Sequence, residues 1–416
     1  MCMDIFPCHI IEAHAASCGE SAGNEAIECS TVMEEEQAVM PGPSRSSAAV
    51  TDDWLTIQDP TKAMSQFRDS LLHIYEKESA LVLSMDTRET PAEQDMALLS
   101  FYKRPNVEWA RPLHCRLEGD VAIGKGVTRF FLSTCIEKLK SGFCINFANT
   151  DVTRLFDGET GHLVPSASHF LVESDMFVMA GRMMGHSFLH GGPCLSGLSP
   201  ALAHVLLGGG PETATVALED CPDLDIRETI RLLQGESKLS EEEAKRVQDL
   251  AYAWDLPCLS NNNNRRWLFE KMLIHAVIGR VTRQIKQLRR GLKETQMWTV
   301  LTKRPDTVAL LFPKEGAVDY SPEVLLKRIT WPHHDEEDDD NDFSVDTMCH
   351  VSGYLRQFIE NASPNELGDL VKFWTGWEIL PRTNLSLEVV KGSFPTGLHL
   401  LRDPANPRAL QRLCIF

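Results

Sequence analysis

The segment from Ser363 to Leu401, SPNELGDLVKFWTGWEILPRTNLSLEVVKGSFPTGLHLL, decides the fold of the C-terminal part of the chain. Ser363 suits an N-cap, Pro364 suits the first helical position, and Glu366 stands where a capping box places its carboxylate. Apolar residues then recur at helical spacing, at Leu367, Leu370, Val371 and Trp374. The alternation of Leu385, Leu387 and Val389 indicates a half-buried strand. The segment therefore predicts a helix followed by a strand.

Two motifs in this segment resemble the C-terminal lobe of HECT-type ubiquitin ligases. They are LVKFWTG at 370–376 and, after the strand, FPT at 394–396. In that family the Pro-Thr pair is followed within a few residues by Thr-Cys-Phe, whose cysteine carries ubiquitin as a thioester. Here the sequence GLHLL stands in its place, so the resemblance puts Leu400 at the catalytic position and implies that the nucleophile is absent.

The codons that could encode 397–407, GLHLLRDPANP, suggest why the cysteine is missing. If one nucleotide is dropped at the Gly397 codon, the shifted frame can read ASTCFETLRIP, which matches the active-site string of the family. At the His399, Asp403 and Asn406 codons the shifted frame allows only Thr or Ile. We therefore expect 397–416 to be an out-of-frame tail.

A second set of motifs resembles the N-terminal lobe of the same family. An acidic-glycine turn at 117–126 precedes a helix that carries Arg129 and paired Phe residues, and NTDVTRLFDGETGHL at 149–163 resembles a strand-turn-strand element. FVMAGRMMGH at 177–186 resembles the F-x-x-x-G-R-x-x-G helix of the family. The resemblance implies an α+β, bilobal HECT domain with a mostly helical N-lobe and a small α/β C-lobe, truncated or scrambled at its end.

The expected organisation follows from these motifs and from local composition. Apolar residues at helical spacing predict one long amphipathic helix with the stripe Leu273, Val277, Val281, Ile285, Leu288 and Leu292. The predicted parts are a disordered acidic, Ser-Ala-rich tail at 1–52, a helical extension at 53–104, the N-lobe at 105–332 with a conjugating-enzyme-binding insert at about 211–262, an acidic linker at 333–346, the C-lobe at 347–396 and the out-of-frame tail at 397–416.

Composition limits the function classes. The net charge of −18 argues against a nucleic-acid partner, which needs clustered Lys and Arg. The basic residues between Arg265 and Arg290 are read as a solvated helix face. No run of 18 apolar residues is present, so no membrane partner is expected. The start of the chain has no basic region typical of a signal peptide, which favours a cytoplasmic or nuclear protein.

The sequence contains several other candidate sites, and each of them is disfavoured. Zinc could suit the spacing of His186, His190 and Cys194, but we favour core or boundary histidines there. At His333 and His334 we favour a hydrated linker over a metal site. The twelve cysteines contain no C-x-x-C pair. Cys135 follows Ser133 and Thr134 in an echo of the active-site string, yet it lies on an apolar helical stripe and is predicted to be a packing residue. Cys414 belongs to the suspect tail.

GDVAIGKG at 119–126 nearly matches a P-loop, but Gly126 replaces the hydroxyl residue and no apolar strand is predicted before it, so nucleotide binding is disfavoured. The resemblance implies a ubiquitin-protein transferase with no cofactor and no metal, whose partners are a ubiquitin-conjugating enzyme, ubiquitin and protein substrates. Only a cysteine has the nucleophilicity and the leaving-group ability that the two acyl transfers require. We expect this chain to be inactive as given. The alternative is a non-catalytic pseudo-ligase, or adaptor, that binds the conjugating enzyme or ubiquitin.

Overall fold

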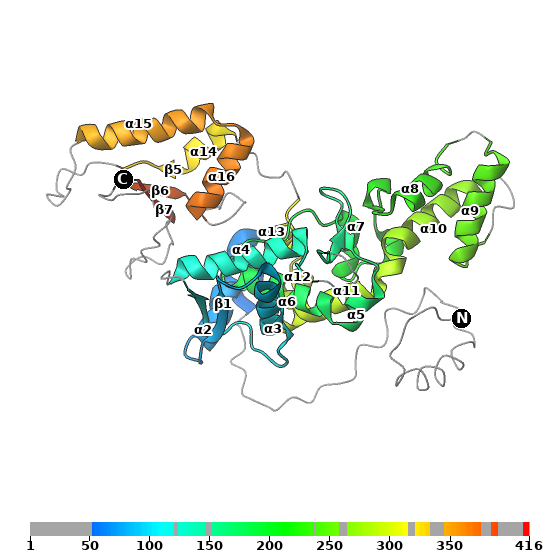
Figure 1. The fold of residues 1–416 in the computed structure, drawn as a ribbon, viewed down its shortest axis with the longest axis horizontal. Helices are drawn as coiled ribbons and strands as arrows, with labels where there is room; N and C mark the ends of the chain where they lie inside the picture. The colour runs from blue at the N-terminus through cyan, green and yellow to red at the C-terminus, as the bar shows by residue number, and fades with distance from the viewer. Residues whose placement is uncertain are drawn as a thin grey trace. The chain divides into compact units, whose positions relative to one another are not determined.

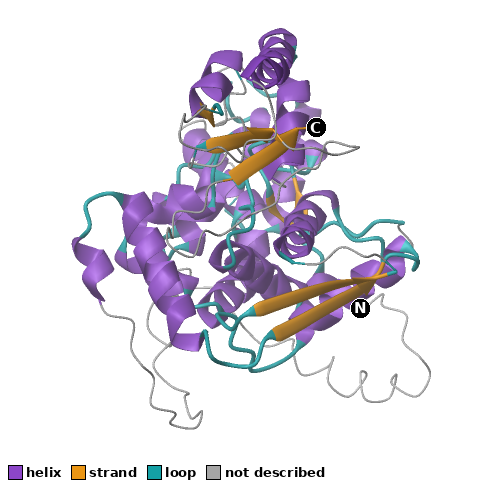
Figure 2. Ribbon diagram, turned by 90° about the vertical axis from the view of Figure 1, so that its left-hand side faces the viewer, coloured by secondary structure: helices purple, strands orange, loops and turns teal. Residues whose placement is uncertain are grey.

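The computed structural model describes residues 52–119, 124–145, 151–235, 238–257, 264–314, 321–332, 345–375, 384–389 and 411–415. All of them belong to one compact unit, Val50–Phe416. The tail predicted at 1–52 and the acidic linker predicted at 333–346 lie almost entirely outside the described residues. The described chain is mostly helical with small sheets, as an α+β protein is (Figures 1 and 2).

The first described part alternates helices and strands. Its elements are η1 (Asp52–Thr56), α2 (Pro60–Tyr75), β1 (Leu81–Asp86), α3 (Pro91–Lys103), β2 (Leu113–Glu118) and α4 (Lys125–Ser141). Strands β1 and β2 pair in parallel from Leu81–Leu113 to Asp86–Glu118. The prediction of a helical extension at 53–104 is therefore wrong in part, because β1 is a strand of the same sheet as β2. Alternating Leu81, Leu83 and Met85 are buried in one core with Trp109 and Phe131.

Two long helices cross at the centre of this core. They are α6 (Met176–Leu189) and α11 (Thr282–Glu294), and they make the most extensive contact between any two described elements. A Cβ added to Gly181 would collide with the carbonyl oxygen of Leu288 and would lie 3.0 Å from the Cα of Gly291. A Cβ added to Gly291 would in turn meet the carbonyl oxygen of Val178. Glycine is therefore required on both helices for the backbones to approach this closely.

Shorter elements surround this crossing. They are the hairpin of β3 (Phe156–Asp157) and β4 (Val164–Pro165), α5 (His169–Glu173), α7 (Pro200–Leu206), η2 (Pro211–Thr213), η3 (Leu218–Asp220), α12 (Met297–Lys303), η6 (Pro305–Thr307) and α13 (Val308–Leu311). The hairpin confirms a strand-turn-strand element, with Phe156 paired to Pro165 and Asp157 to Val164, but its second strand lies just after the predicted range 149–163.

The predicted insert contains α8 (Leu224–Arg231) and α9 (Glu241–Ala253), and α10 (Arg265–Val277) follows it. Helix α9 begins with a capping box, because Glu243 N donates to Ser240 Oγ and Ser240 N donates to Glu243 Oε2. The long helix expected over 273–292 is broken by η5 (Gly279–Val281) into α10 and α11. All six stripe residues are nevertheless buried. The apolar stripe continues across this break because Val281, the last residue of η5, is buried.

A second hydrophobic cluster lies among the last described elements. It takes residues from α14 (Pro322–Arg328), β5 (Ile329–Thr330), α15 (Val345–Asn361), α16 (Pro364–Thr375) and β6 (Leu385–Val389), and β7 (Gln411–Ile415) follows these elements in the chain. The cluster consists of Leu325, Ile329, Ile359, Leu367, Val371, Trp374, Leu385 and Leu387. Because Leu325 and Ile329 belong to it, this core begins before the boundary predicted at 332.

Helix α16 and strand β6 confirm the elements predicted from the opening segment. Glu366 N donates to Ser363 Oγ at 3.4 Å, and Ser363 N donates to Glu366 Oε2 at 2.8 Å, which is the predicted capping box. Strands β5, β6 and β7 form a parallel sheet in that order. Strand β7 lies in the segment expected to be out of frame, where its backbone pairs with β6 from Leu385–Gln411 to Val389–Ile415. Among the described helices, none is long and apolar enough to cross a membrane.

Candidate functional site

The position that the resemblance assigns to the catalytic cysteine, Leu400, lies outside the described residues, as do 394–396. The assignment therefore stays a prediction. The structure instead describes two regions that bear on function. One is the predicted insert with the helix after it, and the other is the set of buried polar side chains that join this insert to the larger core.

Three large apolar side chains are exposed on consecutive helices of this region. Leu224 on α8 is 63% exposed, Tyr252 on α9 is 82% exposed, and Trp267 on α10 is 42% exposed. Helix α8 packs against both α9 and α10, while Val247 and Ala251 of α9 are fully buried. The helices thus bury one side of themselves and leave aromatic residues in solvent. Tyr and Trp are enriched in the buried centres of protein interfaces, so this region has the composition of a protein-binding surface.

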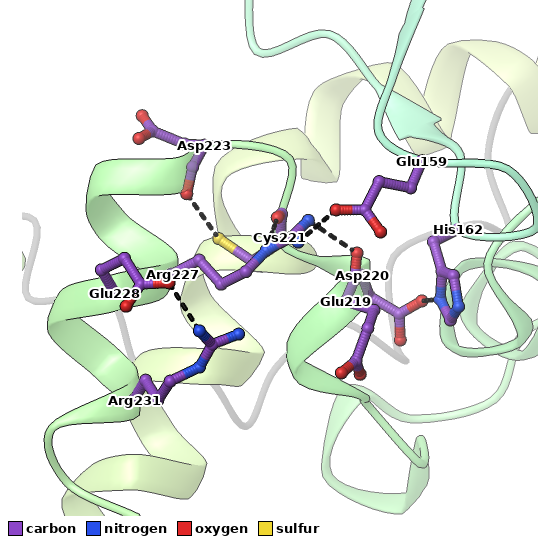
Figure 3. A network of polar contacts seen from close by, with 9 residues as sticks. All are labelled: Glu159, His162, Glu219, Asp220, Cys221, Asp223, Arg227, Glu228 and Arg231. Atoms are coloured by element: carbon purple, nitrogen blue, oxygen red, sulfur yellow. Dashed lines mark hydrogen bonds and ion pairs between the residues drawn. The ribbon is translucent and has the colours of Figure 1, made fainter.

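A polar network fixes the start of α8 to the β3–β4 turn (Figure 3). Its centre is Arg227, whose side chain is almost completely buried. Its Nε donates to the carbonyl oxygen of Cys221 at 2.8 Å, its Nη2 donates to that of Glu219 at 3.1 Å, and its Nη1 pairs with Glu159 of the turn. The Arg227 guanidinium in turn lowers the pKa of the Glu159 carboxyl. One side chain therefore holds three segments together.

A second pair joins η3 to the β3–β4 turn. Asp220 is buried, and its Oδ1 lies 2.8 Å from Nδ1 of His162 in the turn (Figure 3). Its Oδ2 accepts a hydrogen bond of 2.8 Å from the backbone N–H of Ala217. A His backed by a buried Asp can act as a general base, but a base alone carries no reaction. The neighbouring thiol of Cys221 is buried, and burial raises its pKa, so it is a poor nucleophile. The pair is best described as structural.

The two histidines weighed as zinc ligands have other partners. His186 is fully buried on α6, with Nδ1 2.9 Å from the Tyr102 hydroxyl, and Nε2 of His190 lies 2.9 Å from the carbonyl oxygen of Trp109. Burial, the nearby His190 and Arg104 together lower the pKa of His186 well below its usual value. The prediction of a core histidine at 186 is confirmed. Among the described residues, no group of three or more His, Cys, Asp or Glu side chains is placed to bind a metal ion.

Cys135 is a packing residue, as predicted. It is fully buried on α4, its Sγ lies 3.5 Å from the Tyr102 hydroxyl, and burial raises the pKa of its thiol to about 12. A thiol with that pKa is almost never a thiolate near neutral pH. Cys135 therefore cannot replace a catalytic cysteine at position 400.

A strand precedes the P-loop-like segment, because β2 ends at Glu118, and α4 begins at Lys125 after Gly124. It is not an apolar strand, since β2 alternates apolar and polar residues. The magnesium-binding hydroxyl is still replaced by Gly126, so nucleotide binding remains disfavoured. Residues 120–123 lie outside the described part of the chain.

Comparison with known proteins relates the chain to ubiquitin ligases. It is 26% identical over 255 residues to the G2/M phase-specific E3 ubiquitin-protein ligase of Gallus gallus, and the alignment covers 59% of this chain and 33% of that protein. The proteins of the same name from Macaca fascicularis and Homo sapiens are each 23% identical over 256 residues, covering 58% of this chain and 34% of theirs. The matched region thus spans about a third of the length of these relatives. No protein-family model matches the chain. These partial similarities support a relationship to E3 ubiquitin-protein ligases.

Local sequence patterns do not reveal the contacts that join the insert to the larger core. Arg227 and Glu159 are 68 residues apart, and His162 and Asp220 are 58 residues apart. The only local signal is the unusual Arg within the apolar face of α8, between Ile226 and Ile230. A buried Arg requires partners, so this position could have been singled out, although its partner could not.

Proposed function

We propose that this chain is a HECT-type member of the ubiquitin-ligase proteins whose insert at about 211–262 docks a ubiquitin-conjugating enzyme. The observation that carries the proposal is the exposure of Tyr252 on α9 and of Trp267 on α10, in a chain that is similar to E3 ubiquitin-protein ligases. The order of the motifs at 177–186, 370–376 and 394–396 supports the HECT type. The proposed location is the cytoplasm or the nucleus, where conjugating enzymes meet their ligases.

By family, the reaction would be a two-step acyl transfer. A thiolate attacks the thioester of the conjugating enzyme, takes the ubiquitin carbonyl and releases the enzyme thiolate, and a substrate lysine amine then attacks the new thioester. Leu400 has no nucleophilic atom, and Cys135 is buried with a raised thiol pKa. We therefore expect the chain as given to bind the conjugating enzyme without accepting ubiquitin. In a protein with the frame restored, a cysteine at position 400 would accept it.

The non-catalytic alternative is a pseudo-ligase that acts by binding alone. It is favoured by the same exposed residues, because they are independent of the suspect tail. Sequencing the genomic DNA and the transcript across codons 390–416 separates the two. An extra nucleotide absent from both would mean that the natural protein has its nucleophile, whereas one present in both would mean a natural pseudo-ligase or a decaying gene.

Docking is tested by measuring the affinity of the full chain for a panel of conjugating enzymes, with the variant Tyr252→Ala. We expect at least one enzyme to bind and the variant to weaken it by about tenfold or more, as truncation of an interface aromatic typically does. Tyr354→Ala is the matched control, because Tyr354 is a similarly exposed tyrosine on α15. Equal losses in the two variants, or no binding to any enzyme, would exclude docking through the insert.

Transfer is tested with the frame-restored protein. It should form a ubiquitin adduct that thiol reductants cleave, and replacement of the new cysteine by alanine should abolish that adduct. If the frame-restored protein binds the conjugating enzyme but forms no reducible adduct, the transferase assignment is refuted while the docking assignment stands.

A further inference from the structure

A basic pocket lies beside the insert, lined by side chains from several elements. Its volume is ≈ 620 Å³, and its wall comes from the end of α4, the β3–β4 hairpin and the chain up to α5, the residues just before α8, and the α10–η5 junction. The cationic residues of this wall are Lys140, Arg154 and Arg280. Pockets of this size hold small ligands or a few side chains of a peptide.

The two arginines of the basic pocket are available to a ligand. Arg154 and Arg280 are both exposed, and neither makes an ion pair with a carboxylate of the described residues. This distinguishes them from the arginines at 227, 231, 266 and 290, which pair with Glu. Lys140 also lines the pocket, where its Nζ donates to Ser196 Oγ at 2.7 Å.

Two carboxylates also line the basic pocket, at Asp157 and Asp223. The Asp223 carboxylate caps α8, where its Oδ1 accepts a hydrogen bond of 3.2 Å from the backbone N–H of Ile226. Its negative charge is thus directed at the helix N-terminus, which stabilises it there. The wall therefore has three cationic side chains and two carboxylates, and one of these carboxylates, Asp223, already caps α8. This excess of cations is unusual in a chain whose net charge is −18.

We infer that the basic pocket binds an oxyanion carried by an acidic peptide segment, with Arg154 and Arg280 as the recognising residues. A guanidinium presents several N–H donors in a planar fork that matches the two oxygens of a carboxylate or phosphate. The hydroxyl groups of Ser166 and Ser168, which also line the pocket, add neutral donors. A peptide fits better than a nucleic acid, because a concave pocket with two carboxylates would repel a continuous row of phosphates. This inference does not depend on ubiquitin transfer or on the docking of a conjugating enzyme.

The test is fluorescence anisotropy with the full chain and three labelled peptides of equal length. One contains a run of glutamates, one contains phosphoserines at the same positions, and one contains serines. We expect the glutamate or the phosphoserine peptide to bind and the serine peptide not to, and we expect the affinity to fall as salt is raised. The arms distinguish a carboxylate from a phosphate as the source of the oxyanion.

The deciding variant is Arg154→Glu with Arg280→Glu, and it should weaken the binding at least tenfold, or about 1.4 kcal/mol. The control is Arg266→Glu with Lys286→Glu, which makes the same change in net charge at exposed positions outside the pocket. Circular dichroism would report whether the charge reversal disturbs folding. If it does, the milder pair Arg154→Gln with Arg280→Gln replaces it, and this pair should also weaken peptide binding. Equal losses in the reversal variant and the control, or equal binding of all three peptides, would overturn the inference. Displacement by an oligonucleotide that binds more tightly would likewise overturn it.

Discussion

Replacing Gly181 with alanine should destabilise the protein by preventing the close crossing of α6 and α11. The added methyl would be driven into the carbonyl oxygen of Leu288 and would lie 3.0 Å from the Cα of Gly291. Both are backbone atoms, so no side-chain rotamer change can relieve the contact. The helices must separate, which opens the most extensively packed contact of the core.

The size of the effect follows from two opposing contributions. Alanine is favoured over glycine in a helix interior by about 1 kcal/mol. Overpacking typically costs about 1–3 kcal/mol, and more where the backbone itself must move. We therefore expect the free energy of unfolding to fall by about 2 kcal/mol, measured by urea unfolding with the slope of the transition unchanged.

The matched control is Gly353→Ala on α15. A Cβ added to Gly353 has no atom within 4 Å, so only the gain in helix propensity remains. We expect this variant to be slightly more stable than the parent, by up to about 1 kcal/mol. If Gly181→Ala is as stable as Gly353→Ala, the crossing does not depend on the glycine and the packing argument is wrong.

Three further outcomes are expected. Burial lowers the pKa of His186 in the folded protein below its value in the unfolded chain. As the pH falls below about 6.5, the unfolded chain therefore takes up a proton on this histidine before the folded protein does. The free energy of unfolding should then fall by up to about 1.4 kcal/mol per pH unit. Urea unfolding at pH 7.5 and 5.5 should show a smaller loss in His186→Gln than in the parent. Iodoacetamide should label the exposed Cys349 in the folded protein and should label the buried Cys135 only after urea unfolds the chain. Mass spectrometry of the peptides measures the order of labelling, and labelling of Cys135 before Cys349 would contradict the prediction. Ser363→Ala should lower helix stability by about 1 kcal/mol, whereas Ser363→Asp should not, as measured by thermal denaturation.

Local signals made part of the fold predictable. The capping boxes at Ser240 and Ser363 each use two residues three positions apart, so the sequence alone contains both partners. The stripe from Leu273 to Leu292 was predicted correctly as a buried face, because periodic burial is recorded in the identities of the residues. The spacing could not reveal the break at Gly279, since three residues of 3₁₀ helix keep the same face buried.

The remaining features depend on contacts between distant residues. Strand β1 pairs with β2 about thirty positions later, and a parallel partner leaves no turn signature between the two strands. The Arg227–Glu159 pair and the basic pocket likewise combine residues from well-separated segments. Their individual side chains look like ordinary surface charges in the sequence. Only the fold distinguishes the arginines that have carboxylate partners from those that are available to a ligand.

Strand β7 has a consequence for the history of this chain. It occupies the edge of the β5–β6–β7 sheet and is joined to β6 through peptide groups, which every residue except proline carries in the same form. An edge position therefore accepts residues that were never selected for it, provided that they can extend. A reading-frame change upstream of Gln411 would then remove the chemistry of a site without leaving the neighbouring strand uncovered. Loss of catalytic activity and loss of the folded structure would then be separate events, and a chain without its catalytic cysteine would still fold and bind its partners.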